Sequence, residues 1–262
     1  MRFFASLTQT LTVLVRQVAT DHEREVFSSM VLSAIGQHAA RLAPVDITGF
    51  LAMAGHAYDR SLMVVGRAVN GWTEAISLNL LGTPAEAERY AMVVQESVNG
   101  NGDCPMRWVT ARWGARKGYN TRRSAFWRCI RDVVQRLCIA DVGRTDWPSH
   151  LVWSNLYKVS PASGGNPNNA LCNIQLPGCV ELFNLELRTY RPRRILFLTG
   201  ADWAAPFLPA GILQESAGLR HVKQFGLISA GEGHDVRYVV AVHPQGKPES
   251  EWVHEVVTAF NR

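Results

Sequence analysis

The chain has 262 residues, of which 47% are hydrophobic and 19% are charged, with a formal net charge of +5 and a pI near 9.1. This is the composition of an ordinary globular protein, and no stretch approaches the ~20 apolar residues that a membrane-spanning helix needs. We therefore expect a soluble, cytoplasmic protein without a membrane partner. The five cysteines form no CxxC pair, which predicts reduced thiols and neither a disulfide framework, a metal site nor a cofactor.

Hydrophobic spacing and cap residues divide the chain into helices and strands. Residues 3–18 have apolar side chains at helical spacing, and a capping-box pattern at 20–23 opens a second helix that runs toward Arg41. The sequence Thr83-Pro84-Ala85-Glu86 combines a cap with a proline at the first helical position, so a helix follows over 85–98. We further expect a connector over 44–55, a loop over 163–169, helices over 122–138, 175–190 and 249–260, and strands over 62–66, 151–154, 195–198, 225–229 and 238–242.

Alternating strands and helices predict an α/β fold, in the form of a three-layer α/β/α sandwich with a mostly parallel central sheet of about four strands. We expect one domain over residues 1–262 and a monomer. Within that domain, residues 1–55 form a helical N-terminal extension and residues 103–131 form a basic, aromatic insertion.

Polar side chains follow the buried strands at the point where each strand ends. Asn70, Asn155, Asp202 and His243 all come just after such a strand. In open α/β sheets, ligands bind in the crevice beyond the carboxyl ends of the strands. The sequence therefore predicts that these side chains gather at one cleft.

The stretch between Arg107 and Arg136, which covers most of the insertion, is strongly basic and contains a single acidic residue, Asp132. Aromatic residues are interleaved with its cations, a pattern typical of a nucleic-acid groove. Alternatively, the cations form only a solvated helix face. The expected DNA contacts are Arg112, Arg116, Lys117, Arg122 and Arg123, and the interleaved aromatic residues are Trp108, Trp113, Tyr119 and Trp127.

Several motifs in the stretch 62–250 agree in order and spacing with one known family. A strand ends in a glycine loop at 65–71, a second ends in Asn155 with Lys158 and Pro161 beyond it, and the helix before the third strand has a central Cys179. The third strand ends in Gly-Ala at 200–201, and the last motif is His-Pro at 243–244. Together these residues resemble the uracil-DNA glycosylase superfamily, most closely its family 4 branch in the middle motifs.

The chain departs from the family pattern at two places. The family's first loop has an acidic or amide residue one or two positions after its glycine, where this chain has Arg67 and Ala68; the nearest carboxamide is Asn70. The family's Fe–S cluster needs a CxxC near the N-terminus and a cysteine after the lysine, and Val159 stands at the second position. We therefore expect no cluster.

The resemblance implies a monofunctional DNA glycosylase that flips out a base and hydrolyses its N-glycosidic bond. His243 would donate to the departing base, Asn155 would bind the base edge, and Asn70 would hold the water. Trp72 would stack on the base. Further base contacts are expected from Gly66, Arg67 and Ala68, and further DNA contacts from Lys158, Gln245, Gly246 and Lys247.

Structural roles compete with these functional ones. His243 can cap a strand end, Asn155 can bind loop amides, and Asp202 can cap the helix after the third strand. Lys158 can be a Schiff-base nucleophile, although a phosphate contact or a snorkelling side chain is the commoner use.

Three functions fit these residues. The leading hypothesis is a glycosylase for a bulky modified pyrimidine, such as the hydroxymethylated or glucosylated cytosine of phage DNA, in a defence role; plain uracil is the alternative substrate. The second is a DNA-binding module whose catalysis has decayed, which Ala68 favours. The third is a hydrolase of free nucleosides, which would leave the basic segment without a purpose.

Overall fold

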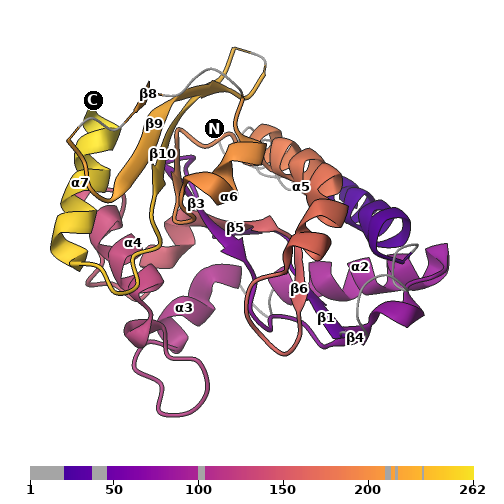
Figure 1. Ribbon diagram of the computed structural model, residues 1–262. Helices are drawn as coiled ribbons and strands as arrows, with labels where there is room; N and C mark the ends of the chain where they lie inside the picture. The colour runs from indigo at the N-terminus through magenta and orange to yellow at the C-terminus, as the bar shows by residue number, and fades with distance from the viewer. Residues whose placement is uncertain (1–20, 37–45, 100–103, 210–213, 216–217, 232) are drawn as a thin grey trace, which may run out of the picture. The chain divides into compact units, whose positions relative to one another are not determined.

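The computed structural model describes residues 21–36, 46–99, 104–209, 214–215, 218–231 and 233–262 (Figure 1). The chain forms two compact units. Unit 1 comprises Met1–Leu51, Asn70–Ser97 and Tyr157–Thr189, and unit 2 comprises Ala52–Val69, Val98–Leu156 and Tyr190–Arg262. The helix predicted over 3–18 lies outside the described residues, and the single domain over 1–262 stays a prediction.

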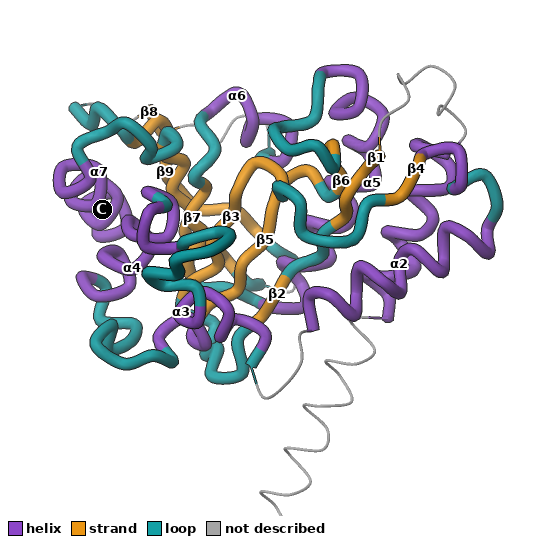
Figure 2. Tube along the Cα trace, turned by 90° about the horizontal axis from the view of Figure 1, so that it is seen from below, coloured by secondary structure: helices purple, strands orange, loops and turns teal. Residues whose placement is uncertain are grey.

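Unit 2 is built on a seven-stranded sheet in the order β2-β5-β3-β7-β10-β9-β8 (Figure 2). The pairings of β3 with β7 and of β7 with β10 are parallel, whereas β2 with β5, β9 with β10 and β8 with β9 pair antiparallel. This confirms the α/β class, with a wider sheet than the four strands expected. The strands are β2 (Met53–Ala54), β3 (Leu62–Ala68), β5 (Leu151–Tyr157), β7 (Arg194–Phe197), β8 (Gln214–Glu215), β9 (Val222–Ser229) and β10 (Asp235–Ala241).

The central strands run farther than their apolar cores predicted. β3 extends through Arg67 and Ala68, and β5 is buried along its whole length, so Asn155 lies inside a strand rather than in the loop after it. β9 begins at Val222 rather than near 225, and it is antiparallel to β10 because only a short connection joins the two strands. Pairing with neighbours, which a local pattern does not reveal, sets these ends.

The helices of unit 2 include one pair that packs together and covers part of its sheet. α7 (Glu249–Asn261) packs on β9, β10 and α4 (Ala125–Arg136), and Arg128 on α4 pairs with Glu249 on α7. Both helices were predicted from sequence, with ends that differ by at most three residues. The remaining helical segments are η4 (Pro105–Arg107), α3 (Trp108–Ala111), η5 (Thr121–Arg123), η6 (Trp147–His150), α6 (Ala201–Ala204) and η7 (Ala205–Phe207).

Unit 1 contains a three-stranded antiparallel sheet in the order β4-β1-β6, which the sequence did not predict. These strands, β1 (Asp46–Gly49), β4 (Ile76–Ser77) and β6 (Val159–Pro161), have two to four residues each, too few for an alternating pattern to stand out. The expected connector over 44–55 therefore contains both β1 and β2. The helical segments are residues 21–36, which end in the π-helical turn η1 (Val31–Ile35), then η3 (Leu78–Leu80), α2 (Pro84–Asn99) and α5 (Asn169–Tyr190).

Side-chain caps and one arginine organise the helices of unit 1. The cap predicted at Thr83 forms, because the Glu86 N–H donates to Thr83 Oγ1, and the same hydroxyl donates to the Glu86 carboxylate. α5 begins six residues earlier than expected because Asn168 caps it, its Oδ1 accepting from Leu171 N–H at 2.9 Å.

Among the described residues, no helix is long and apolar enough to cross a membrane.

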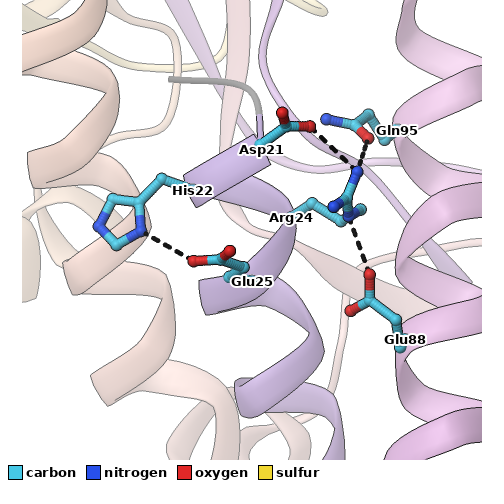
Figure 3. Close-up of polar contacts among 6 residues, drawn as sticks. All are labelled: Asp21, His22, Arg24, Glu25, Glu88 and Gln95. Carbon is cyan, nitrogen blue, oxygen red and sulfur yellow. Dashed lines mark hydrogen bonds and ion pairs between the residues drawn. The ribbon is translucent and has the colours of Figure 1, made fainter. Parts of the chain in front are cut away.

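Figure 3 shows how Arg24 joins the first described helix to α2. Its Nε donates to Glu88 at 2.9 Å, and its Nη1 donates to Asp21 at 3.1 Å and to Gln95 at 3.0 Å. The guanidinium thus holds two helices with charge-assisted bonds in planar geometry, which an ammonium cannot reproduce.

A buried ion pair lies at the start of β6. Lys158 and Glu186 of α5 are both fully buried, and the ammonium donates to the carboxylate. Beside them, Gln175 accepts from the Val159 N–H at 2.9 Å and donates to the Val159 carbonyl at 2.8 Å. Fully buried polar groups therefore link α5 to β6.

We predict that Lys158→Met lowers the free energy of unfolding by about 3–5 kcal/mol, because it leaves the Glu186 carboxylate buried without its cation. Urea unfolding of the variant measures the loss. The double variant Lys158→Met/Glu186→Leu should recover most of it, and Arg188→Met, an exposed change on the same helix, should shift stability by less than about 0.5 kcal/mol. Equal losses in the single and double variants would contradict this account.

Candidate functional site

The carboxyl ends of three parallel strands meet at one edge of the unit 2 sheet. Val65 of β3 and Val240 of β10 both pair with Phe197 of β7. Past these pairs, Leu198 N–H donates to the Val65 carbonyl and Gly200 N–H donates to the Ala241 carbonyl, each at 2.9 Å. The residues that follow these three strands therefore lie close together at this edge of the sheet.

Arg67 is fixed at this edge by two contacts. Its Nε donates to the Thr199 carbonyl at 2.8 Å, and its guanidinium lies 5.4 Å from the centroid of the Trp203 ring. The side chain is half-buried, and burial lowers the pKa of the guanidinium, which nevertheless stays charged at neutral pH. The site thus contains a held positive charge, and an anion that forms beside it is stabilised.

His243 follows β10 and is half-buried. Its Nδ1 accepts a hydrogen bond from Gln245 N–H at 3.3 Å, so the neutral ring has its proton on Nε2. The ring stacks on Phe126, with centroids 6.3 Å apart and an interplanar angle of 24°. Burial, and then the charge of Arg67, lower the pKa of His243. At neutral pH the residue is therefore an uncharged hydrogen-bond donor through Nε2.

Asn155 of β5 is 2% exposed, and its Nδ2 has no hydrogen-bond partner among the described residues. Its Oδ1 lies directly against Gly66 of β3, in the space that a Cβ on residue 66 would occupy, and Phe126 borders the same space. A buried amide donor without a partner costs about 1–3 kcal/mol, unless a ligand or a water accepts from it. This carboxamide therefore has binding capacity that the fold leaves unused.

We predict that Gly66→Ala lowers the free energy of unfolding by about 1–3 kcal/mol, because the added methyl overlaps the Asn155 carboxamide. Urea unfolding measures the change. Asn155→Ala in the same chain removes the overlap and should restore part of the loss. Gly82→Ala, where an added Cβ meets no atom within 4 Å, is the matched control, and a loss of the same size there would contradict the steric explanation.

The lowered pKa of His243 makes stability depend on pH. The unfolded chain protonates this imidazole near pH 6.5, whereas the folded protein protonates it only at lower pH. The free energy of unfolding therefore falls as the pH drops through this window, and we predict a shallower fall for His243→Gln, which has no such group. Urea titrations of both proteins from about pH 7.5 to about pH 5.5 test this difference; superimposable profiles would contradict it.

Three residues to which the sequence gave roles belong to unit 1. Asn70 is exposed, and its Oδ1 accepts from Gly165 N–H at 3.1 Å. Trp72 is half-buried and packs edge-on against Phe50, with centroids 5.7 Å apart. Lys158 is the buried partner of Glu186, so the expected phosphate contact does not agree with its position.

The basic segment of unit 2 contains α3 and the first part of α4, and the chain between these two helices projects beyond α3 in Figure 1. Trp127 is a correction to the sequence interpretation, because it is 1% exposed and packs on Trp108 and Trp153 in the core. Among the aromatic residues of this segment, Tyr119 is the exposed one, at 56%. The five cations expected to contact DNA are all exposed, namely Arg112, Arg116, Lys117, Arg122 and Arg123.

The turn after His243 is also exposed. Lys247 N–H donates to the Pro244 carbonyl at 3.0 Å, and Gly246 has a φ of 72°, which suits glycine at the third position of a tight turn. Gln245, Gly246 and Lys247 therefore lie at the surface beside the half-buried imidazole. A partner that approaches this turn also approaches His243.

Sequence reasoning missed three members of this edge. Phe126 of α4 borders the space that lies between Gly66 and the Asn155 carboxamide, and its ring stacks on His243. The Thr199 carbonyl and the Trp203 ring hold Arg67, and Asp202 is an exposed residue in the first turn of α6. The Thr-Gly-Ala-Asp-Trp sequence after β7 carried a signal for these positions, because it follows a buried strand.

Comparison with protein-family models and with curated proteins found no match to this chain. The functional conclusion therefore depends on the residues and their geometry.

Proposed function

We propose that the protein is a monofunctional DNA glycosylase, which hydrolyses the N-glycosidic bond of a flipped-out base and leaves an abasic site. The observation that carries the proposal is Asn155, a buried carboxamide with an unused donor, next to a glycine and an aromatic ring at the edge where His243 and Arg67 lie. A pyrimidine edge offers the acceptor that the Nδ2 group lacks. The motif resemblance supports the same conclusion.

The chemistry follows from the charges at this edge. When the bond between the sugar C1′ and the base nitrogen breaks, the electron pair leaves with the base and the sugar becomes oxocarbenium-like. His243 Nε2–H can donate to the base anion, and the neighbouring Arg67 charge stabilises it further. Water then adds to C1′ and releases its proton to solvent. The proposed mechanism relies on charge stabilisation of the leaving group more than on deprotonation of the water.

The exposed cations of the basic segment support DNA as the substrate. These five side chains form no ion pair with the described part of the chain, so their charge is available to phosphates. The exposed residues 245–247 lie beside His243, where the superfamily inserts its wedge into the duplex. In this proposal the enzyme is a cytoplasmic monomer with a three-layer α/β/α arrangement.

We propose a modified pyrimidine as the base, with hydroxymethylcytosine and its glucosylated form as candidates and uracil as the alternative. Arg67 and Ala68 replace the small acidic or amide residues of the uracil-excising pattern, and Arg67 is already engaged with Thr199 and Trp203. This departure also supports a second candidate function, a DNA-binding module without catalysis.

The test is release of abasic sites. DNA duplexes that carry uracil, hydroxymethylcytosine or glucosylated hydroxymethylcytosine are incubated with the protein and treated with alkali. We expect strand breaks at one of these bases, and a loss of about 10²–10³ in rate for His243→Gln, because one preorganised donor is removed. Asn155→Asp, which replaces the amide donor by an oxygen, should show a loss of comparable size.

Matched variants separate the alternatives. His254→Gln and Asn184→Asp are exposed changes elsewhere and should leave the rate unchanged. Arg122→Glu/Arg123→Glu should slow excision from DNA in a salt-dependent way, whereas a nucleoside hydrolase would be indifferent to it. No breaks on any substrate would overturn the enzyme proposal. Salt-dependent DNA binding that persists in His243→Gln would then identify the binding module.

A further inference from the structure

A histidine and two glutamates converge in unit 2 outside the site described above. His221 lies immediately before β9, and Glu251 and Glu255 lie one turn apart on α7. One potential ligand atom from each residue lies within 4.8 Å of the other two. The three side chains therefore join the start of a strand to the helix that packs on it.

The His221 imidazole is buried without a hydrogen bond at Nε2. The residue is 2% exposed, and this nitrogen has no hydrogen-bond partner among the described residues. Its nearest charged neighbour is Glu251 Oε2 at 3.8 Å, which is too long for a hydrogen bond. This nitrogen therefore lies close to the two carboxylates and has no hydrogen bond to the described part of the chain.

Glu255 is held in a fixed orientation. It is 7% exposed, and its oxygens accept from the backbone N–H groups of Arg220, His221 and Val222. An ionised carboxylate has about four acceptor positions, so one remains after these three bonds. Hydrogen bonds of this kind orient a ligand and are typical of the groups that surround a metal ion.

We propose that His221 Nε2 and the carboxylates of Glu251 and Glu255 bind a divalent cation of the Zn²⁺ class, with water at the remaining position. Ligand atoms about 2.1 Å from one ion lie about 3–4 Å apart, which the 3.8 Å separation already satisfies. Because 46% of the Glu251 side chain is exposed, its carboxylate can move the small distance that lets all three ligand atoms reach one ion. One imidazole with two carboxylates suits a borderline cation, and the ion offsets two negative charges.

The ion would also stiffen the backbone before His243. The His221 carbonyl accepts from Val242 N–H at 2.9 Å, and Trp252 Nε1 donates to the Val242 carbonyl at 2.8 Å. The two segments that supply the ligands therefore hold Val242 from both sides. In this role the three ligands position other residues and take no part in the reaction. The cysteine pattern gave no sign of the site because none of its ligands is a cysteine, and His221 lies 30 and 34 residues before the two glutamates.

The test uses the full chain, stripped with a chelator and titrated with Zn²⁺ against a chromophoric competitor. We expect one equivalent to bind and the midpoint of thermal unfolding to rise by about 5–10 °C at a free Zn²⁺ concentration a hundred times Kd. Glu251→Gln, an exposed change that the fold tolerates, should weaken Kd at least about tenfold. His221→Asn should abolish the thermal shift.

His254→Gln is the matched control, because it removes an exposed imidazole from the same helix and should leave binding unchanged. Failure of the stripped protein to bind one equivalent would overturn the proposal. So would a Glu251→Gln variant with unaltered affinity, or loss of binding in His254→Gln, which would indicate a surface site. No DNA is present in these measurements, so their outcome is independent of the proposed base excision.

Discussion

The parallel register of β3, β7 and β10 is the constraint on which the site depends. Since the three strands run in one direction and pair through Phe197, whatever follows them is brought to the same edge. The strand ends leave backbone groups without ladder partners, and the Arg67 guanidinium takes up one of them, the Thr199 carbonyl. The positive charge of Arg67 is thus held in place by a hydrogen bond to the backbone at the strand ends.

The electrostatics of this edge favour negative charge on a bound group. Arg67 carries a positive charge, and the same charge helps burial keep His243 neutral. A neutral imidazole whose Nδ1 accepts a backbone N–H can only donate through Nε2. Both groups therefore stabilise an anion that forms beside them, and neither has to reorganise when the charge develops. In the proposed function Asn155 adds selectivity, since a buried amide discriminates strongly against a ligand that cannot pair with it.

Sequence reasoning found the elements whose signals are local. Runs of apolar residues revealed the cores of β3, β5, β7 and β10, and the cap at Thr83 gave the start of α2. It missed β1, β4 and β6, which exist only because they pair with one another. It also placed Trp127 in a nucleic-acid groove and expected Lys158 to contact DNA, because their partners, Trp153 and Glu186, are distant in sequence. Residue type alone does not show whether an indole or an ammonium is already satisfied.

The polar residues of the motifs fall into two groups, according to whether their polar atoms are already paired within the fold. In unit 1, the polar groups to which the sequence gave roles have partners within the fold: the Asn70 Oδ1 binds Gly165 N–H, and the Lys158 ammonium binds Glu186. In unit 2, the Asn155 Nδ2 group has no acceptor within the described part of the chain, and the proton on His243 Nε2 faces away from the bond that Nδ1 makes. A residue can match a family motif and still lack the hydrogen-bonding capacity that ligand binding requires, because its polar atoms are already paired within the fold. Function is therefore best sought where a buried polar atom keeps hydrogen-bonding capacity that the fold does not use.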